Sequence, residues 1–196
     1  SFSEFILSLF SVQDKHKVLL VTKSKHIYNL LRHNYQEQAI VSFSLNAEPV
    51  ATEFEKGAPS VAERITAARE LNLFGYQVRA RIDPLVPVIG WEQSYKALLD
   101  LVFANFIPSR ITFGSLRGLQ STINQATDKR WVNYLSERSN WGKKIEFTLR
   151  KEMYMALIEY LETKWQYKEV SLCKETIEMW NALGMDYTAI KCNCLL

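Results

Sequence analysis

Glycine is scarce in this sequence, which has 7 glycines among 196 residues, all of them scattered. Without a glycine-rich loop there is neither a dinucleotide-binding fingerprint nor a P-loop for nucleotide phosphates. The Gly-x-Ser-x-Gly turn that exposes the nucleophile of many serine hydrolases is also missing. The sequence therefore offers none of the common nucleotide-binding or hydrolase motifs.

Cysteine and histidine are also rare, with three residues of each type. Cys173, Cys192 and Cys194 are an odd number in the last quarter of the chain, which argues against a disulfide framework and favours a reducing cytoplasm. Cys192 and Cys194 are closer together than in the usual zinc hairpin. The three thiols leave open a three-thiolate site or simply buried or free cysteines. The histidines lack His-x-x-x-His spacing and predict no metal site.

Long apolar runs are absent, so the sequence predicts no association with a membrane. The longest early run, residues 5–10, is far shorter than a membrane span and lacks the features of a signal peptide. The chain starts at Ser1 rather than Met, and residues 1–10 already have the apolar spacing of a helix interior. We therefore expect a piece of a longer protein.

Charge of one sign does not dominate, since 24 basic residues face 21 acidic ones and leave a net charge of +3. This balance does not argue for nucleic acid by itself, but it permits an anionic ligand. Hydrophobic residues make up 47% of the chain and charged residues 23%, as in an ordinary globular domain. The length is sufficient for one buried core.

Short apolar runs alternate with helical patterns along the chain. The predicted strands are 17–24, 39–46, 76–83, 110–118 and 168–175. The predicted helices are 2–10, 26–34, 61–74, 91–106, 147–165 and a short one through 179, while 47–60 is expected to be a loop. Ser60 and Glu63 form a capping box before the helix 61–74, and Gly75 follows it. The alternation predicts an α/β fold with mostly parallel strands, either a partial barrel or a doubly wound sheet.

Polar side chains follow the apolar part of several predicted strands. They are Lys23, Ser44, Asn46, Arg81, Asp83, Ser115 and Arg117. Because the carboxyl ends of parallel strands meet at one edge, we expect these residues on one rim. A lysine there can pair with a carboxylate, a serine can bind an amine, and arginines suit anionic groups. Strand ends are also polar where loops are simply hydrated, so the pattern alone fits both readings.

These strand ends carry a resemblance to a known family. The segments LLVTKS (19–24), VSFSLN (41–46) and RITFGSLRG (110–118), with the long stretch 55–87, are similar to radical S-adenosylmethionine (SAM) enzymes of the spore photoproduct lyase type. The resemblance covers roughly residues 17–118. It implies a partial (β/α)6 barrel that lacks its N-terminal strand or strands. We expect residues 1–166 to form this barrel, and 167–196 to add a strand, a short helix and a cysteine-containing tail to the same domain.

The resemblance also implies a chemistry. Members of this family use a [4Fe–4S] cluster to cleave SAM to a 5′-deoxyadenosyl radical that abstracts hydrogen, and the lyase acts on a thymine dimer in DNA. SAM is thus the implied cofactor and DNA an implied partner. The implied contacts with SAM are Lys23 to the methionyl carboxylate, Ser44 to the amine, Asn46 or Asp83 to the ribose, and the backbone from Ile82 to Pro84 to the adenine. Arg81 and Arg117 are assigned either to an anionic group of the substrate or to ion pairs within the protein.

The sequence departs from the family in one respect: it contains no Cys-x-x-x-Cys-x-x-Cys motif for the cluster. The C-terminal cysteines do not match that motif. We therefore expect the cluster ligands in a missing N-terminal part of the same barrel, and we expect this chain alone to be inactive. The alternatives are a non-catalytic barrel remnant that serves as a binding or interaction domain, and an unrelated barrel enzyme with similar strand ends.

Overall fold

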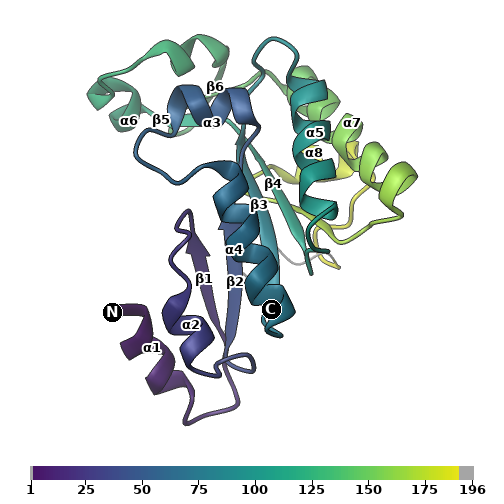
Figure 1. Cartoon of the computed structure of the whole chain (residues 1–196). Helices are drawn as coiled ribbons and strands as arrows, with labels where there is room; N and C mark the ends of the chain where they lie inside the picture. Colours follow the sequence, from purple (N-terminus) through teal and green to yellow (C-terminus); the bar gives the residue numbers. More distant parts are fainter. Residues whose placement is uncertain (1, 190–196) are drawn as a thin grey trace.

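A five-stranded sheet lies at the centre of the computed structural model, which describes residues 2–189 (Figure 1). Its order is β1-β2-β3-β4-β8, and all neighbouring strands are parallel. The strands are β1 (Val18–Thr22), β2 (Ala39–Ser44), β3 (Gln77–Leu85), β4 (Ile111–Ser115) and β8 (Val170–Leu172). The expected α/β fold with mostly parallel strands is confirmed.

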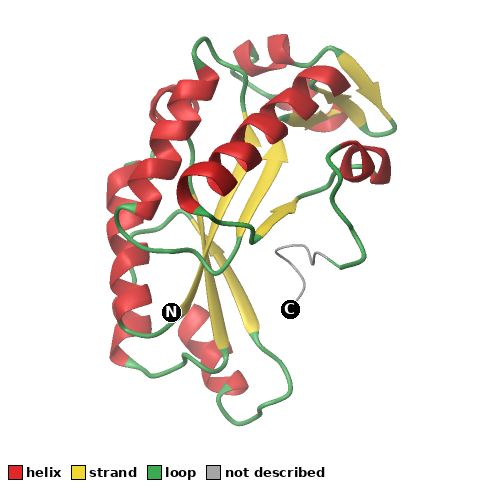
Figure 2. Ribbon diagram, turned by 90° about the vertical axis from the view of Figure 1, so that its right-hand side faces the viewer, coloured by secondary structure: helices red, strands yellow, loops and turns green. Residues whose placement is uncertain are grey.

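Helices connect these strands and cover the sheet, as Figures 1 and 2 show. They are α1 (Phe2–Phe10), α2 (Tyr28–Arg32), α3 (Glu48–Phe54), α4 (Val61–Leu73), α5 (Trp91–Phe103), α6 (Gln120–Gln125), α7 (Phe147–Trp165), α8 (Ile177–Ala182) and the 3-10 helix η1 (Arg130–Tyr134). Among the described residues, no helix is long and apolar enough to cross a membrane.

A second, antiparallel sheet differs from the expected fold. It consists of β5 (Arg117–Leu119), β7 (Gly142–Lys144) and β6 (Glu137–Ser139), in that order. The predicted strand 110–118 is therefore two strands in two sheets. The sequence pattern could not show this division because a strand keeps its two-residue alternation whichever partner it pairs with.

Helix α3 is a second difference, since it lies inside the predicted loop 47–60. Its Pro49 stands in the first turn, where a helix has no need of the missing backbone N–H, so the proline does not prevent the helix. Val50 is buried while most of this short helix is half-exposed or exposed. Tertiary packing, rather than a strong helical pattern, therefore forms α3.

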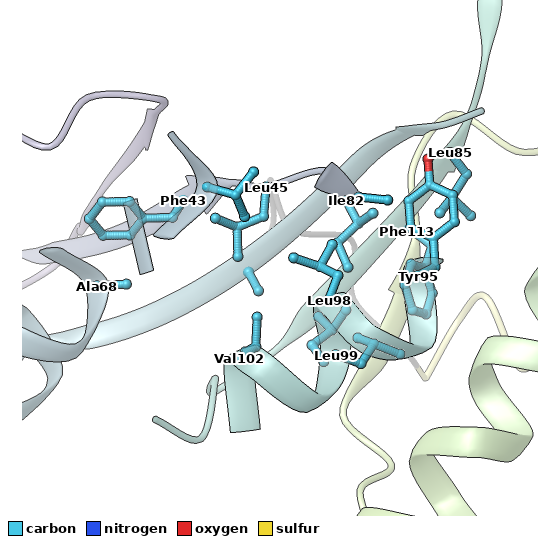
Figure 3. Close-up of a cluster of buried hydrophobic side chains, with 14 of the residues drawn as sticks. Phe43, Leu45, Ala68, Ile82, Leu85, Tyr95, Leu98, Leu99, Val102 and Phe113 are labelled. Atoms are coloured by element: carbon cyan, nitrogen blue, oxygen red, sulfur yellow. The ribbon is translucent and has the colours of Figure 1, made fainter. Parts of the chain in front are cut away.

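The apolar face of the large sheet packs against helices. Phe43, Ala80, Ile111 and Val170 are neighbours in register on successive strands and are buried. Figure 3 shows Phe43, Ile82 and Phe113 of the sheet in one cluster with Ala68 of α4 and Leu98, Leu99 and Val102 of α5. This cluster is the core of the domain.

The opposite face of the sheet is polar. One residue further along each strand, Ser44, Arg81 and Thr112 are neighbours in register, and Ser171 pairs with Thr112. Since side chains alternate between the two faces, these residues share the face that the helical core does not occupy. The hydroxyls of Thr112 and Ser171 lie 2.9 Å apart and are both buried. The large sheet thus has one face that packs in the apolar core and an opposite face that carries polar side chains.

The capping box before α4 is confirmed and supports a prediction. The Glu63 backbone N–H donates to Ser60 Oγ at 3.2 Å, and the Ser60 N–H donates to the Glu63 carboxylate at 2.9 Å. We expect Ser60→Ala to lower the free energy of unfolding by about 1 kcal/mol because a helix donor loses its partner. Urea denaturation measures this loss. Thr66→Ala on the exposed face of α4 is the control and should lose nothing; equal values for both variants would contradict the prediction.

Candidate functional site

Two cavities adjoin at the carboxyl edge of the large sheet. The first, which we name the Lys23 cavity, has a volume of about 460 Å³, and the second, the basic cavity, about 660 Å³. Pro84 and Leu116 line both cavities and therefore form the wall between them. Pro84 follows a cis peptide bond after Asp83. Pro84 thus lies between the two cavities and inside β3, which continues to Leu85 instead of ending at residue 83 as predicted.

Lys23 stands at the end of β1 and lines the cavity that bears its name. Its Nζ lies 2.9 Å from Oε1 of Glu55, in the loop between α3 and α4. Glu55 Oε2 in turn lies 2.7 Å from the guanidinium of Arg64 on α4. The lysine is partly exposed, whereas Arg64 is 1% exposed and Glu55 7% exposed. Lys23 is therefore held in place by a buried ion pair behind it.

The electrostatics of this group favour a charged carboxylate. Burial raises the pKa of Glu55, but the hydrogen bonds and charges of Lys23 and Arg64 outweigh it and hold the pKa below its ordinary value. Arg64 also donates to the backbone carbonyl of Ser44 at 2.8 Å. Glu55 and Arg64 thus connect the ends of β1 and β2. Sequence reasoning missed both residues, although Arg64 lies one turn after Val61 on the buried stripe of α4, where an arginine is unusual.

Asn46 fixes the exit of β3 beside the Lys23 cavity. Its Nδ2 donates to the carbonyl of Pro84 at 3.0 Å, and its Oδ1 accepts from the Tyr95 hydroxyl at 2.9 Å. The same hydroxyl accepts from the Val86 N–H at 2.8 Å. Burial raises the pKa of Tyr95, so this hydroxyl stays protonated at neutral pH. Asn46 and Tyr95 therefore hold the wall between the cavities.

Asp83 joins two arginines. Its Oδ2 lies 2.5 Å from the Arg81 guanidinium and 3.2 Å from that of Arg117. Gly114 makes room for this carboxylate, because a Cβ there would lie 2.6 Å from Asp83 Cγ. Arg81 also donates to Cys173 Sγ at 2.9 Å. Burial, followed by the charge of Asp83, raises the pKa of the Cys173 thiol, so it remains protonated.

The basic cavity lies between the edge of the large sheet and the antiparallel sheet. Its cationic lining residues are Arg117, Arg138, Lys143, Lys144 and Lys174. Asp83 is the acidic residue in its lining, and that carboxylate is already shared by two arginines. Trp141, between β6 and β7, is 78% exposed and also lines the cavity. The cavity therefore combines excess positive charge with an exposed aromatic ring.

A scan against protein-family models matches residues 3–117 to the spore photoproduct lyase family, which is more than half of the chain. The chain belongs to this family. The spore photoproduct lyase of Bacillus subtilis (strain 168) is 32% identical over 107 residues, which are 53% of this chain and 31% of that protein.

Solved structures of spore photoproduct lyase share the fold. One, complexed with dinucleoside spore photoproduct, has a TM-score of 0.71 at 20% identity and matches 87% of this chain and 54% of its own. A mutant lyase with bound AdoMet and the same dinucleoside has the same score. This chain thus spans about half the length of the solved lyases and less of the curated relative. The resemblance inferred from the sequence is confirmed.

The residues expected to form a SAM site in this lyase-family chain are only partly brought together. Lys23 and Asn46 line the Lys23 cavity, while Asp83 and Arg117 line the basic cavity. Ser44 and Arg81 are register neighbours but line neither cavity. The Ile82 side chain is fully buried in the core (Figure 3), so only its backbone can face a ligand. The roles assigned to these residues remain predictions.

The cysteines of this lyase-family chain separate into two groups. Cys173 is a free, buried thiol just after β8. Cys192 and Cys194 lie outside the described residues. Within residues 2–189 there is no group of three His, Cys, Asp or Glu side chains that could hold a metal ion.

Proposed function

We propose that this chain forms part of a radical SAM enzyme of the spore photoproduct lyase family, with SAM in the Lys23 cavity and substrate in the basic cavity. The observation that carries the proposal is the shared wall of Pro84 and Leu116. Molecules bound in two cavities that share this wall would lie next to each other. The proximity of two bound molecules is what the protein contributes to such chemistry.

The Lys23 cavity suits the amino-acid end of SAM. An ammonium group has three protons to donate, and Glu55 accepts one of them, so Lys23 can also bind a carboxylate. Ser44 Oγ, at the end of the neighbouring strand but outside the cavity lining, is the proposed partner of the amine. Asn46 in the cavity, or Asp83 in the adjacent basic cavity, is the proposed partner of the ribose. The backbone from Ile82 to Pro84 is the proposed contact of the adenine. SAM, when bound, supplies the 5′-deoxyadenosyl group in this family.

The [4Fe–4S] cluster that the family implies does not fit residues 2–189, which hold no suitable ligand group. We derive no step through it. We propose instead that the cluster ligands belong to the N-terminal part of the barrel, which this chain does not span, and that this chain alone does not cleave SAM. Residues 167–196 are proposed to complete the same domain, since β8 pairs with β4.

The basic cavity suits a DNA substrate. Lysine and arginine side chains bind phosphates, and an exposed tryptophan can stack on an unpaired base. Arg117 is the better candidate for an anionic group of the substrate, because it borders the cavity and its side chain is 30% exposed. Arg81 also contacts Asp83 but does not line the cavity and is 15% exposed. A thymine dimer bound in the basic cavity would lie next to the proposed SAM site. The odd number of cysteines makes the cytoplasm the proposed compartment.

Titration calorimetry with SAM tests the proposal. We expect Lys23→Ala to weaken binding by about 1.5–3 kcal/mol, roughly 10- to 100-fold, because a hydrogen bond to a charged group is lost. Lys17→Ala, just before the opposite end of β1, is the matched control and should bind normally. Equal affinity of both variants would remove Lys23 from the site. If the unaltered chain does not bind SAM, the alternative of a non-catalytic binding domain is favoured.

A further inference from the structure

One wall of the Lys23 cavity comes from the chain that follows α6 and runs into the 3-10 helix η1. Ala126, Thr127, Asp128 and Trp131 of this segment line the cavity. They lie outside residues 3–117, which match the family model, and none of the roles implied by the resemblance falls on them. The cavity therefore has a wall to which no contact with a ligand has been assigned.

The indole ring of Trp131 is held in place on this wall. Its Nε1 donates to the backbone carbonyl of Asp128 at 2.8 Å. The six-membered part of the ring lies against Gly118, because a Cβ at that position would lie 2.7 Å from Trp131 Cζ3. Trp131 is half-buried and lines the cavity, so part of the ring is accessible from it. A side chain fixed in this way loses little conformational freedom when it binds a ligand.

Arg130 joins this segment to α3. Its guanidinium lies 2.9 Å from Oε1 of Glu53, 2.6 Å from Oδ2 of Asp128 and 5.7 Å from the centroid of the Phe54 ring. Glu53, Phe54 and Asp128 all line the Lys23 cavity. Phe54 and Trp131, the aromatic residues of the described lining, are thus carried by two elements that one arginine holds together.

The lining near Trp131 suits a flat, uncharged group. The carboxylates of Glu53 and Asp128 are both paired with Arg130, so they do not favour a cation beside the ring. A nucleoside base stacks well on an aromatic side chain, because every base has a π-face. The cavity therefore combines a ring for a base with the ammonium group of Lys23 for a carboxylate.

We propose that Trp131 contacts the adenine of SAM. Pro84, whose backbone is the proposed adenine contact, lines the same cavity. The inference rests on the proposed function, because it takes SAM as the ligand of the Lys23 cavity. It deepens that function by adding a side chain that recognises the base to a contact made otherwise by backbone.

Calorimetric titration of the chain with SAM and with adenosine tests this contact. Adenosine has the base and ribose of SAM but no carboxylate, so its binding should depend on Trp131 and not on Lys23. We expect Trp131→Leu to weaken binding of both ligands about fivefold or more, because base stacking is lost. Trp131→Phe keeps an aromatic ring and should retain most of the affinity. Lys23→Ala should weaken binding of SAM alone.

Tryptophan fluorescence gives a readout that a merely structural role would not change. Adenosine should quench the emission of the unaltered chain, and this quenching should be lost in Trp131→Phe although adenosine still binds. Trp91→Leu is the matched control, since Trp91 is also half-buried but lines neither the Lys23 cavity nor the basic cavity. It should keep both the quenching and the affinity. Circular dichroism checks that each variant folds.

Equal adenosine affinity of Trp131→Leu and the unaltered chain, or an equal loss with Trp91→Leu, would overturn the proposal. SAM binding that depends on Lys23 but not on Trp131 would overturn it and leave the proposed function in place. Adenosine binding that depends on Trp131, together with SAM binding that Lys23→Ala does not change, would support this contact and contradict the role of Lys23. Binding of neither ligand would overturn both.

Discussion

Arg150→Ala is expected to lower the free energy of unfolding by about 3–5 kcal/mol, because it leaves a buried carboxylate without its cation. Arg150 on α7 and Glu175 after β8 form an ion pair in which the side chains are 1% and 3% exposed. Glu175 also accepts hydrogen bonds at 2.7 Å from the hydroxyls of Ser115 and Tyr154. Loss of Arg150 therefore affects β4, α7 and the segment after β8 together.

Guanidinium or urea denaturation of the unaltered protein and of Arg150→Ala measures this loss of stability. Lys151→Ala, at the next and more exposed position of α7, is the matched control and should change stability by less than about 0.5 kcal/mol. Glu175→Gln should cost less than Arg150→Ala, because the amide oxygen can still accept from Ser115 and Tyr154 and the buried Arg150 keeps Glu137 as a counter-ion at 3.4 Å. A loss below about 1 kcal/mol for Arg150→Ala would show that solvent reaches Glu175.

Arg64→Ala is the second substitution with a large expected effect. It removes the buried one of the two cations that pair with Glu55, leaving the partly exposed Lys23, and it removes the donor to the Ser44 carbonyl from a site where Arg64 is 1% exposed. We expect a loss of about 3 kcal/mol or more at neutral pH. Arg69→Ala on the exposed side of the same helix is the control and should be nearly neutral. Similar losses for both variants would contradict the role assigned to the buried pair.

The effect of Arg64→Ala should depend on pH. The folded state holds the pKa of Glu55 below its ordinary value of 4.5, so the carboxylate stabilises the fold fully above that pH. This contribution is lost as the pH falls through the lower pKa of the folded state. The difference in the free energy of unfolding between the unaltered protein and Arg64→Ala should therefore be constant near pH 7 and shrink below about pH 4.5. Denaturation curves from pH 3 to 7 measure it, and a difference that grows in acid would be contrary to this linkage.

The polar residues near the strand ends were easier to predict than their partners. The sequence placed Lys23, Ser44 and Asp83 at strand ends from the apolar run before each. In the structure Lys23 follows β1 and Ser44 ends β2, whereas Asp83 lies within β3, which continues to Leu85. The pairing of Lys23 with Glu55 could not be predicted, because Glu55 lies 32 residues away in a segment expected to be a loop. Likewise the network of Arg150 and Glu175 joins residues 25 positions apart on different elements.

The sequence by itself determined the alternation of strands and helices, the capped start of α4 and membership of the lyase family. The first two features depend on local spacing, which a chain carries wherever it folds, and family membership rests on the resemblance of whole segments of the sequence. Only the tertiary structure decided that residues 110–119 divide between two sheets, that the strand ends border two cavities rather than one, and that Trp131 lines the same cavity as Lys23. Each of these depends on which distant segments meet, and a one-dimensional pattern does not contain that information.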